Sequence, residues 1–417
     1  MLASGGLAAT AVVGVPAVRA QDARRLKGMP RRASSGPRGF GGARYAARAS
    51  QGWMAPRAWR TCSTSSGWSR GLGTLAPLRA VKGQEGVPAF AEEGPLWEQV
   101  PNVDLSGWDD AASFLANDLG VSADPASDPA GARRIHHYYL PVFYWTLKRI
   151  QMNNAVLDQG TAPAWSGRDQ NNEVRKSDAR RPMFLGISAP QGCGKTTLVG
   201  ALERLLESKG LRCVVASMDD FYLTGAEQDA VAAANPGNAL LQFRGNAGTH
   251  DVNLAVSTFD KLRTLEAGET CAVPRYDKSL RGGKGDRAPE SEWVVAKGPV
   301  DVVLFEGWSF GFRPLELEEG ETAPPDVAKL DENLRFQGYS EWANAMDSWL
   351  TIRVDNVDCV YKWRLQAEHQ RIAEGGAGLS DEAIRDLSIA SCLRTRPIYP
   401  PCTTRGHGCA GTNTPPP

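Results

Sequence analysis

The chain has 417 residues, of which 42% are hydrophobic, enough to build one large domain or two small ones. Its 47 Lys and Arg residues balance its 47 Asp and Glu residues, which excludes a general electrostatic attraction to nucleic acid or to an anionic membrane. No apolar run is long enough to cross a bilayer, and the 8 cysteines lack the spacing of a metal site. Scattered reduced thiols in an intracellular enzyme fit this pattern.

The beginning of the chain differs in composition from the rest. Residues 1–85 are rich in Arg, Ala, Gly and Ser, and Asp22 is the only acidic residue before Glu85. We interpret this segment as a transit peptide or disordered leader, which is kept out of the fold prediction. Three alternatives are a disordered basic arm, a secretory signal built on the apolar stretch from Leu7 to Val18, and a wrongly assigned gene start.

A helical region is expected over residues 95–155. Short apolar turns around Phe114 and Leu119 precede the aromatic run from Ile135 to Trp145, in which Pro141 predicts a kink. His136 and His137 are adjacent, so on a helix they cannot both face one metal ion. The polar residues from 158 to 181 then predict a linker to the next domain.

The most informative motif follows an apolar run from Met183 to Ser188 and precedes a helical pattern that begins at Thr197. Strand, glycine-rich loop, Gly-Lys-Thr and helix form the arrangement of a P-loop, although an alanine stands where the first glycine is usual. An ordinary glycine-rich turn is the alternative. The residues predicted to bind ATP are Ala189, Pro190, Gln191, Gly192, Cys193, Gly194, Lys195, Thr196 and Thr197.

The residue types of this motif suit the binding of a triphosphate. Gly192 and Gly194 let backbone N–H groups turn toward phosphate oxygens, and the start of the following helix adds partial positive charge. Lys195 can reach the outer phosphates, and the hydroxyl of Thr196 is a candidate ligand for Mg²⁺.

Further apolar strands are expected at Cys213–Ser217, Val300–Phe305 and Trp349–Val354, with helical segments between them. Near-continuous apolar strands favour a mostly parallel sheet covered on both faces. The predicted fold is therefore the α/β, three-layer P-loop NTPase fold over residues 182–390, preceded by a small helical region. In such sheets ligands gather at the carboxyl ends of the strands, where Asp219, Glu306 and Asp355 follow.

Acidic residues at two of these strand ends are candidates for catalysis. Asp219 or Asp220 can accept the proton of an attacking hydroxyl or hold Mg²⁺ through water, whereas an acidic helix cap is the structural alternative. Glu306 occupies the place of the Walker B acid and, with Thr196 and Asp219, completes the predicted magnesium ligands. A cap on the next helix is the alternative for Glu306.

A long, basic, glycine-bearing stretch separates the second strand from the third, and a segment of this kind between sheet strands is usually functional. Its arginines and lysines suit a small anionic acceptor, although a solvated basic loop has the same composition. The predicted acceptor-binding residues are Arg244, His250, Arg275, Tyr276, Lys278 and Arg287. Further along, Arg364 on a predicted helix is a candidate lid arginine, with a surface salt bridge as the alternative.

Together these stretches resemble the D-glycerate 3-kinases of plants and algae, which are P-loop kinases related to phosphoribulokinase, uridine kinase and pantothenate kinase. The most specific matching blocks are Asn235-Pro236-Gly237-Asn238-Ala239 and Arg244-Gly245-Asn246-Ala247-Gly248-Thr249-His250-Asp251. The resemblance covers roughly residues 97 to 387. It implies transfer of the γ-phosphoryl group of ATP to the 3-hydroxyl of D-glycerate, with Mg²⁺ and in the chloroplast stroma, where the reaction closes the photorespiratory cycle.

By the same resemblance Asp219 is the preferred base and Asp220 the second choice. The remaining alternatives are another small-molecule P-loop kinase, a nucleotide-dependent ATPase or switch, an inactive relic, and a cytoplasmic location. The guanine-reading Asn-Lys-x-Asp of GTPase switches and the Leu-Ser-Gly-Gly signature of ABC-type ATPases do not occur in the sequence. Residues 391–417 lack strand or helix periodicity and are expected to be disordered.

Overall fold

The computed structural model describes residues 11–12, 83, 85–100, 103–158, 181–315, 317, 322–352, 358–373 and 381. The chain divides into two units, and all of these residues belong to the one formed by Met1–Pro16 and Pro77–Pro417. Most of the predicted leader and linker, together with Asp355 and the predicted tail, lie outside the described residues.

A five-stranded sheet forms the centre of this unit, in the order β1-β9-β2-β8-β3. Its strands are β1 Ala11–Val12, β2 Met183–Ser188, β3 Cys213–Ser217, β8 Val302–Gly307 and β9 Ser348–Ile352. All neighbours are parallel except β1, which pairs antiparallel with β9. The first two predicted strands have the predicted bounds, and the third is shifted two residues toward its carboxyl end. Because β2 lies between β9 and β8, the strand that leads into the P-loop is inside the sheet.

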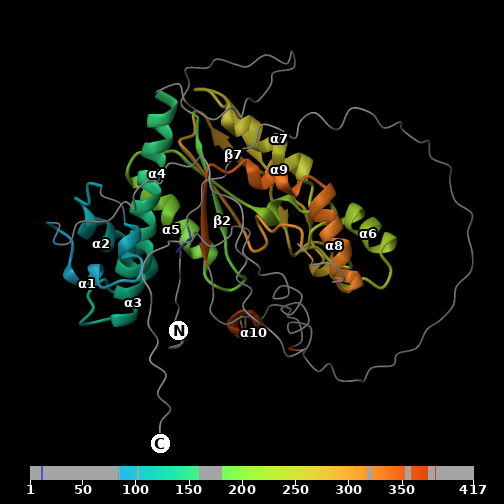
Figure 1. Ribbon diagram of the computed structural model, residues 1–417, viewed down its shortest axis with the longest axis horizontal. Coiled ribbons are helices and arrows are strands. Elements are labelled where there is room, and N and C mark those ends of the chain that lie inside the picture. The colour runs from blue at the N-terminus through green and yellow to red at the C-terminus, as the bar shows by residue number, and fades with distance from the viewer. Residues whose placement is uncertain are drawn as a thin grey trace, which may run out of the picture. The chain divides into compact units, whose positions relative to one another are not determined.

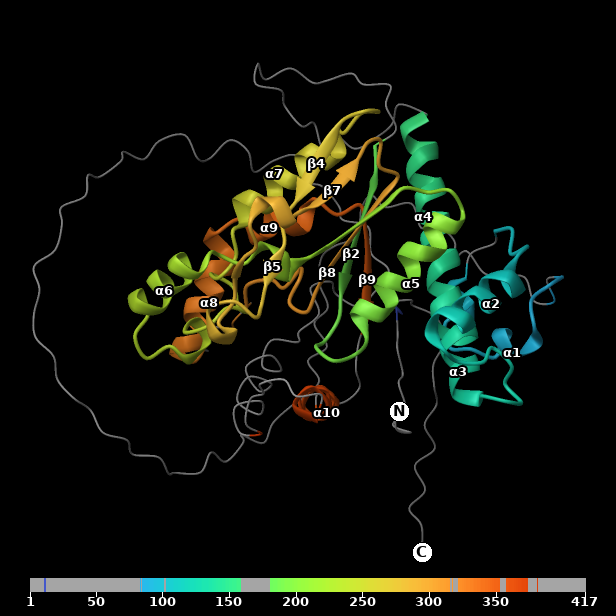
Figure 2. The same ribbon diagram turned by 180° about the vertical axis from the view of Figure 1, so that it is seen from behind.

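Both faces of the sheet are buried, because successive side chains of each strand enter different cores. In β2, Leu185 and Ile187 pack with helices α2 (Trp108–Leu119), α4 (Leu140–Asp158) and α5 (Lys195–Ser208). Phe184 instead packs with α7 (Val252–Arg263), α8 (Pro325–Phe336) and α9 (Tyr339–Asn344). Figures 1 and 2 show α4 and α5 on one side of the sheet and α7 and α9 on the other. This is the predicted three-layer α/β arrangement.

The expected helical region precedes β2. Its elements are α1 Ala89–Glu92, a 3-10 turn Trp97–Gln99, α2, α3 Pro129–Arg134, a π-helix Ile135–Tyr139 and α4. The expected distortion near Pro141 takes the form of this π-helical turn, since proline provides no N–H to the preceding carbonyls. His136 is buried between the indole N–H of Trp108 and the carbonyl of Ala123, and His137 stacks on Phe90. Both histidines thus have structural contacts.

The long stretch between β3 and β8 contains more regular structure than its sequence suggested. Its helices are α6 Gly225–Ala234 and α7. Two antiparallel ribbons form as well, one from β4 Thr270–Val273 and β7 Val294–Lys297, the other from β5 Tyr276–Asp277 and β6 Asp286–Arg287. The stretch also contains 3-10 turns at Met218–Phe221, Ala239–Leu241, Arg281–Gly283 and Glu290–Glu292. After β9 comes α10, Asp358–Ala373. The predicted helix that carries Arg364 is this last element.

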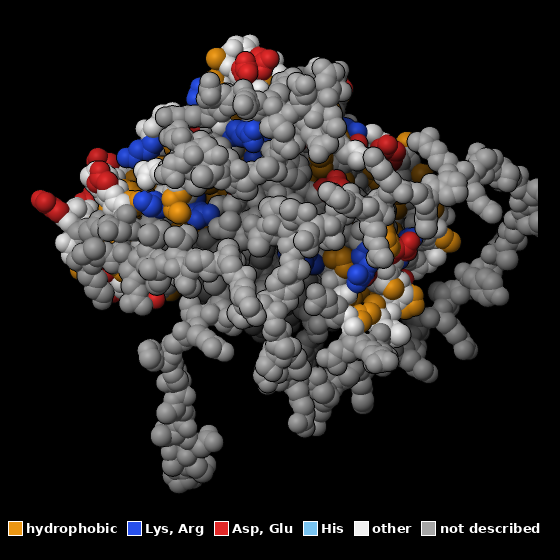
Figure 3. Space-filling view, turned by 45° about the horizontal axis from the view of Figure 1, so that its top comes forward, with side chains coloured by type: hydrophobic (Ala, Val, Ile, Leu, Met, Phe, Trp, Pro, Cys, Tyr) orange, Lys and Arg blue, Asp and Glu red, His pale blue; other side chains and the backbone are white. Residues whose placement is uncertain are grey.

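Figure 3 shows the side chains of one face, coloured by type. On the face in Figure 3, Lys and Arg side chains form separate groups among acidic and apolar ones. Among the described helices, none combines the length and the apolar character needed to cross a bilayer.

The close packing of β2 gives a test of the fold. A Cβ atom added at Gly186 would lie 2.9 Å from Met346 Cγ and from Trp349 Cε3. We expect Gly186→Ala to destabilise the protein by roughly 1–3 kcal/mol, because it over-packs the core. Gly200→Ala is the matched control: in α5 the nearest atoms to the added Cβ belong to the Arg204 guanidinium, at 3.3 Å or more, at the far end of a flexible side chain, and alanine favours the helix. Thermal unfolding would show a lower Tm for the first variant only, and equal Tm values would contradict the packing.

Candidate active site

The phosphate-loop motif lies between β2 and α5, as the sequence predicts. Gly192 and Gly194 have φ angles of 78° and 85°, in the left-handed region that favours glycine. Lys195 is the first residue of α5, and its Nζ donates a hydrogen bond to the carbonyl of Pro190 at 3.2 Å. Thr196 and Thr197 are exposed in the first turn of the helix. The loop thus presents a lysine, hydroxyl groups and a helix N-terminus to the same side.

Helix α10 packs directly on this loop. A Cβ atom at position 192 would lie only 2.7 Å from Trp363 Cβ, so the close approach of the helix requires glycine as much as the φ angle does. The Arg364 guanidinium donates a hydrogen bond to the Gln191 side chain. The predicted lid arginine is therefore in contact with a loop residue.

The helical region supports the loop from another side. Cys193 and Tyr138 pack against the same hydrophobic core. Burial raises the pKa of the Cys193 thiol above its usual value, although Lys195 opposes the shift. Cys193, Cys213 and Cys271 are free thiols, and burial raises the pKa of each. The loop cysteine accordingly behaves as a packing residue.

The predicted Walker B acid lies at the carboxyl end of β8. Ser217, at the end of the neighbouring strand β3, donates a hydrogen bond to Glu306 Oε1 at 2.8 Å. Burial raises the pKa of Glu306, and the positive charge of Lys195 opposes that rise. The charges of Asp219 and Lys278 also act on Glu306. The structure therefore brings the strand ends and the loop lysine together.

Asp219 has two polar partners at this edge of the sheet. Lys278 Nζ lies 2.7 Å from its Oδ2, and the Tyr222 hydroxyl donates to its Oδ1 at 2.8 Å. Burial by itself would raise the pKa of Asp219, but the charge of Lys278 and the two hydrogen bonds outweigh it and hold the pKa below its usual value. Asp219 is thus an ionised carboxylate near the phosphate loop.

Asp220 has a different environment although it is the next residue. Its Oδ2 accepts hydrogen bonds from the Ser217 backbone at 3.0 Å and from Arg275 at 2.8 Å. The first of these contacts completes a capping box with Ser217, which is the acidic-cap alternative that the sequence left open. Arg275 also donates to the carbonyl of Val215 at 3.3 Å. Burial raises the pKa of Asp220, although the charge of Arg275 opposes the rise. The ion pair between Asp220 and Arg275 joins the turn after β3 to the basic stretch.

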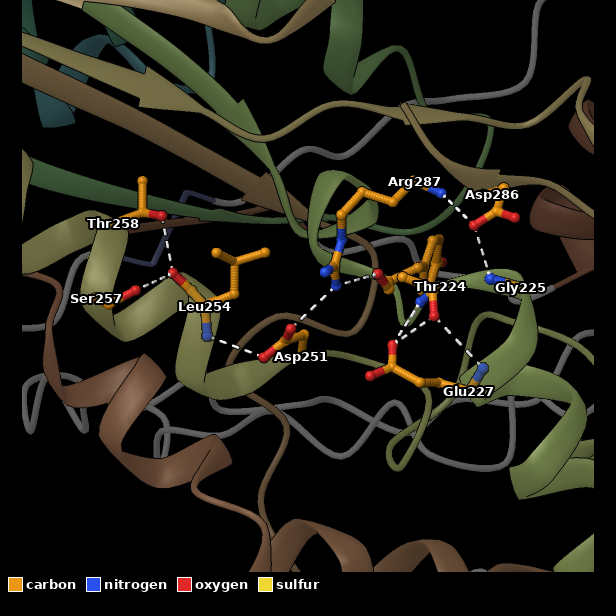
Figure 4. A network of polar contacts seen from close by, with 10 residues as sticks. Thr224, Gly225, Glu227, Asp251, Leu254, Ser257, Thr258, Asp286 and Arg287 are labelled. Carbon is orange, nitrogen blue, oxygen red and sulfur yellow. Dashed lines mark hydrogen bonds and ion pairs between the residues drawn. The ribbon is translucent and has the colours of Figure 1, made fainter. Parts of the chain in front are cut away.

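Two other predicted acceptor-binding arginines hold backbone segments. Arg287 donates to Asp251 Oδ2 at 3.0 Å and to the carbonyl of Tyr222 at 3.1 Å. Figure 4 shows it between Asp251, the cap of α7, and the turn at Thr224 that begins α6. Arg244 lies over the Tyr276 ring, 5.6 Å from its centre, and donates to the carbonyls of two loop residues, Gly283 and Lys284. Of the predicted cationic residues, Lys278 is the one in contact with Asp219.

His250 lies beneath Tyr222. The two rings stack with their centres 4.7 Å apart, and the Tyr339 hydroxyl lies 2.8 Å from His250 Nδ1. Burial lowers the pKa of His250 to about 3, so its ring is neutral. Sequence reasoning did not assign a role to Ser217, Tyr222 or Tyr339. The first two adjoin the acidic pair, which was the available signal, whereas Tyr339 is distant in sequence and gave none.

The residues present fit a magnesium ion. Thr196, Asp219 and Glu306 offer oxygen atoms, which Mg²⁺ prefers, and the buried Glu306 would gain from a nearby cation. Within the described part of the chain, no cluster of three or more His, Cys, Asp or Glu side chains is arranged to hold a metal.

Comparison with known proteins extends this picture. The chain is 41% identical over 281 residues to the chloroplastic D-glycerate 3-kinase of Arabidopsis thaliana, a match that covers 67% of this chain and 57% of that protein. It is 41% identical over 212 residues to the uncharacterized kinase mug58 of Schizosaccharomyces pombe, which covers 49% of this chain and 76% of the relative. No family model matches the chain.

A solved structure supports the same assignment. The D-glycerate 3-kinase of Cryptococcus neoformans var. grubii is 30% identical, covers 61% of this chain and 86% of its own, and superposes with a TM-score of 0.50. The match therefore covers most of that structure. On these grounds, the chain belongs to the D-glycerate 3-kinase family of P-loop kinases.

Proposed function

We propose that the protein transfers the γ-phosphoryl group of ATP to the 3-hydroxyl of D-glycerate and releases 3-phospho-D-glycerate and ADP. The observation that carries the proposal is Asp219, an ionised carboxylate held between Lys278 and Tyr222 at the end of β3. Glu306 lies close enough to Asp219 and Lys195 for both charges to act on its pKa. A base and a phosphate-binding lysine thus meet at one edge of the sheet.

The phosphate loop supports binding of the nucleotide. Its backbone N–H groups from Gln191 to Thr197 and the N-terminus of α5 are suited to the β- and γ-phosphates, and Lys195 neutralises the charge that develops during transfer. Arg364, already in contact with the loop, is placed to stabilise the same charge from α10. Thr196, Asp219 and Glu306 would hold Mg²⁺, which supplies further charge stabilisation when bound.

The transfer itself needs a proton acceptor and no covalent enzyme intermediate. The acceptor hydroxyl forms a bond to the γ-phosphorus, the bond from that phosphorus to the bridging oxygen breaks, and ADP leaves. Asp219 takes the proton of the hydroxyl, because its low pKa keeps it ionised. Asp220 is less suited to this role, since Ser217 and Arg275 occupy its carboxylate.

Lys278 is the cation best placed for the acceptor's carboxylate. It is 58% exposed and contacts Asp219, so it can meet a small acid without leaving the site. Arg244, Arg275 and Arg287 bind backbone or acidic partners. We infer that these three chiefly shape the acceptor site, with Tyr276 beneath Arg244.

We also propose that residues 1–85 direct the protein to the chloroplast, where the reaction would serve photorespiration. The support is the Arg-rich, acid-poor composition of this segment. The name of the Arabidopsis relative, a chloroplastic enzyme, agrees with it.

Lys195→Ala tests the phosphate loop. Removing one preorganised cation is expected to lower kcat by roughly 100- to 1,000-fold, about 3–4 kcal/mol of transition-state stabilisation. Lys209→Ala is the matched control, since Lys209 is exposed just beyond the other end of the same helix. The assay measures 3-phosphoglycerate formed from ATP, magnesium and D-glycerate. Unchanged turnover in Lys195→Ala would contradict the assignment, and ATP hydrolysis that does not depend on glycerate would indicate another function.

The two adjacent aspartates are expected to respond differently to the same substitution. Asp219→Asn removes the base and should lower kcat by roughly 100-fold or more, with some loss of stability as well, because the contacts with Lys278 and Tyr222 are weakened. Asp220→Asn weakens a contact with Arg275 and should cost about 1–3 kcal/mol of stability, seen as a lower Tm, with a smaller loss of kcat. If Asp220→Asn instead caused the larger loss of kcat, the roles of the two would be reversed.

Lys278→Met should change the pH dependence of the reaction. Asp219 acts as a base only when ionised, so activity falls as the pH drops through its pKa. Without Lys278, burial is opposed less strongly and the pKa of Asp219 rises. The acid limb of kcat/KM for D-glycerate is therefore expected to move to higher pH. Lys284→Met, at an exposed lysine of the same basic stretch, should leave the limb in place; an unmoved limb in Lys278→Met would refute the pairing.

A further inference from the structure

The two carboxylate oxygens of Asp219 have partners that differ sharply in exposure. Oδ1 accepts a hydrogen bond from the hydroxyl of Tyr222, a residue that is only 4% exposed. Oδ2 lies 2.7 Å from Nζ of Lys278, whose side chain is 58% exposed. One oxygen is therefore held from the interior of the protein, and the other is held by a side chain that is largely in solvent.

Tyr222 is fixed by the packing around it. Its ring stacks on His250, with 4.7 Å between ring centres, and the two residues also pair as an antiparallel bridge. The ring of Tyr276 meets it edge-on, with its centre 5.2 Å away. Because the ring has little freedom to move, its hydroxyl can keep Asp219 oriented even when the other oxygen has no partner.

Lys278 is held much less firmly. Among the described residues, Asp219 is the one hydrogen-bonding partner of its ammonium group. An exposed ion pair of this kind contributes little free energy, because water replaces the lost contact and the long side chain regains its freedom. A carboxylate on a small acid offers the ammonium the same interaction, so that the exchange of one carboxylate for the other costs little.

The position of Lys278 matters for the chemistry of Asp219. Tyr222 covers the interior side of the carboxylate, so a hydroxyl group or a water molecule reaches Asp219 from the side where Lys278 lies. In the free enzyme the ammonium occupies the approach to Oδ2. The base is therefore present but shielded until Lys278 moves.

We propose that Lys278 shields the base in the free enzyme and moves from Asp219 Oδ2 to the carboxylate of the arriving acceptor, which frees Oδ2 to take the proton of the 3-hydroxyl. The inference rests on the proposed function, since it concerns the base and the acceptor of that kinase. Tyr222 is then a positioning residue, which keeps Asp219 in place during the exchange. Without an acid in the site, water meets a shielded base, and the hydrolysis of ATP stays slow.

The reaction that reports on the shield is ATP hydrolysis in the absence of D-glycerate. The oxygen of water forms a bond to the γ-phosphorus, the bond from that phosphorus to the bridging oxygen breaks, ADP leaves, and Asp219 takes a proton of the water. Lys278→Met removes the ammonium but keeps a side chain of similar length. It is expected to raise the rate of hydrolysis roughly two- to five-fold, the factor that corresponds to one exposed ion pair. Lys284→Met, at an exposed lysine of the same stretch, should leave this rate unchanged.

D-lactate provides a second test, because it is D-glycerate without the 3-hydroxyl and cannot be phosphorylated at that position. It is expected to compete with D-glycerate and to raise ATP hydrolysis by the wild type by roughly the same two- to five-fold, since its carboxylate draws Lys278 away. D-lactamide, the uncharged analogue, should do neither. In Lys278→Met, D-lactate should give no further increase.

Tyr222→Phe tests the positioning role, because it removes the hydroxyl and keeps a ring that can stack on His250. The kcat for D-glycerate is expected to fall roughly 10-fold while KM changes little, since Lys278 still binds the acid. A loss in KM alone would contradict this role.

Hydrolysis that is unchanged or slower in Lys278→Met, or D-lactate that fails to stimulate the wild type, would overturn the inference while turnover of D-glycerate by the wild type remained. Absence of that turnover would overturn the proposed function together with it.

Discussion

Parallel pairing of β3, β8 and β2 is the constraint on which the rest of the site depends. Glu306 pairs in register with Ile187 on one side and with Ser217 on the other. The carboxyl ends of three strands therefore meet at one edge, and the chain leaves each end in a different way: into the phosphate loop, into the acidic turn after Ser217, and past Glu306. A shift of one residue in either pair would exchange the two faces of a strand, so that each of its side chains would enter the opposite core.

The electrostatics of the site follow from how that edge is covered. Burial raises the pKa of Glu306, whereas Lys278 and Tyr222 keep that of Asp219 low. Two neighbouring carboxylates thus differ in their tendency to ionise, because one has cationic and hydrogen-bonding partners that outweigh its burial and the other does not. The 3-10 turn after β3 produces the same separation between Asp219 and Asp220, since it directs one toward Lys278 and the other toward Arg275.

Elements outside the central sheet pack against the phosphate loop and limit the conformations it can adopt. Helix α10 contacts it at Gly192 and Gln191, and the helical region meets it at Cys193. The arginines of the basic stretch bind backbone carbonyls and acidic side chains, and in doing so they fasten the starts of α6 and α7 near Tyr222 (Figure 4). Much of the positive charge in that stretch is therefore paired with groups of the protein itself, which composition alone could not reveal.

The sequence by itself determined the phosphate loop, the positions of the strands along the chain and the acids that follow them, because these depend on local pattern: apolar runs, glycines at fixed offsets, and a lysine next to a threonine. Only the tertiary structure decided which of two adjacent aspartates meets Lys278, which arginines are occupied by structural partners, and how Tyr339 orients His250. Those outcomes depend on side chains far apart in the sequence, 89 residues apart for the last pair, which folding brings into contact and which no local pattern encodes.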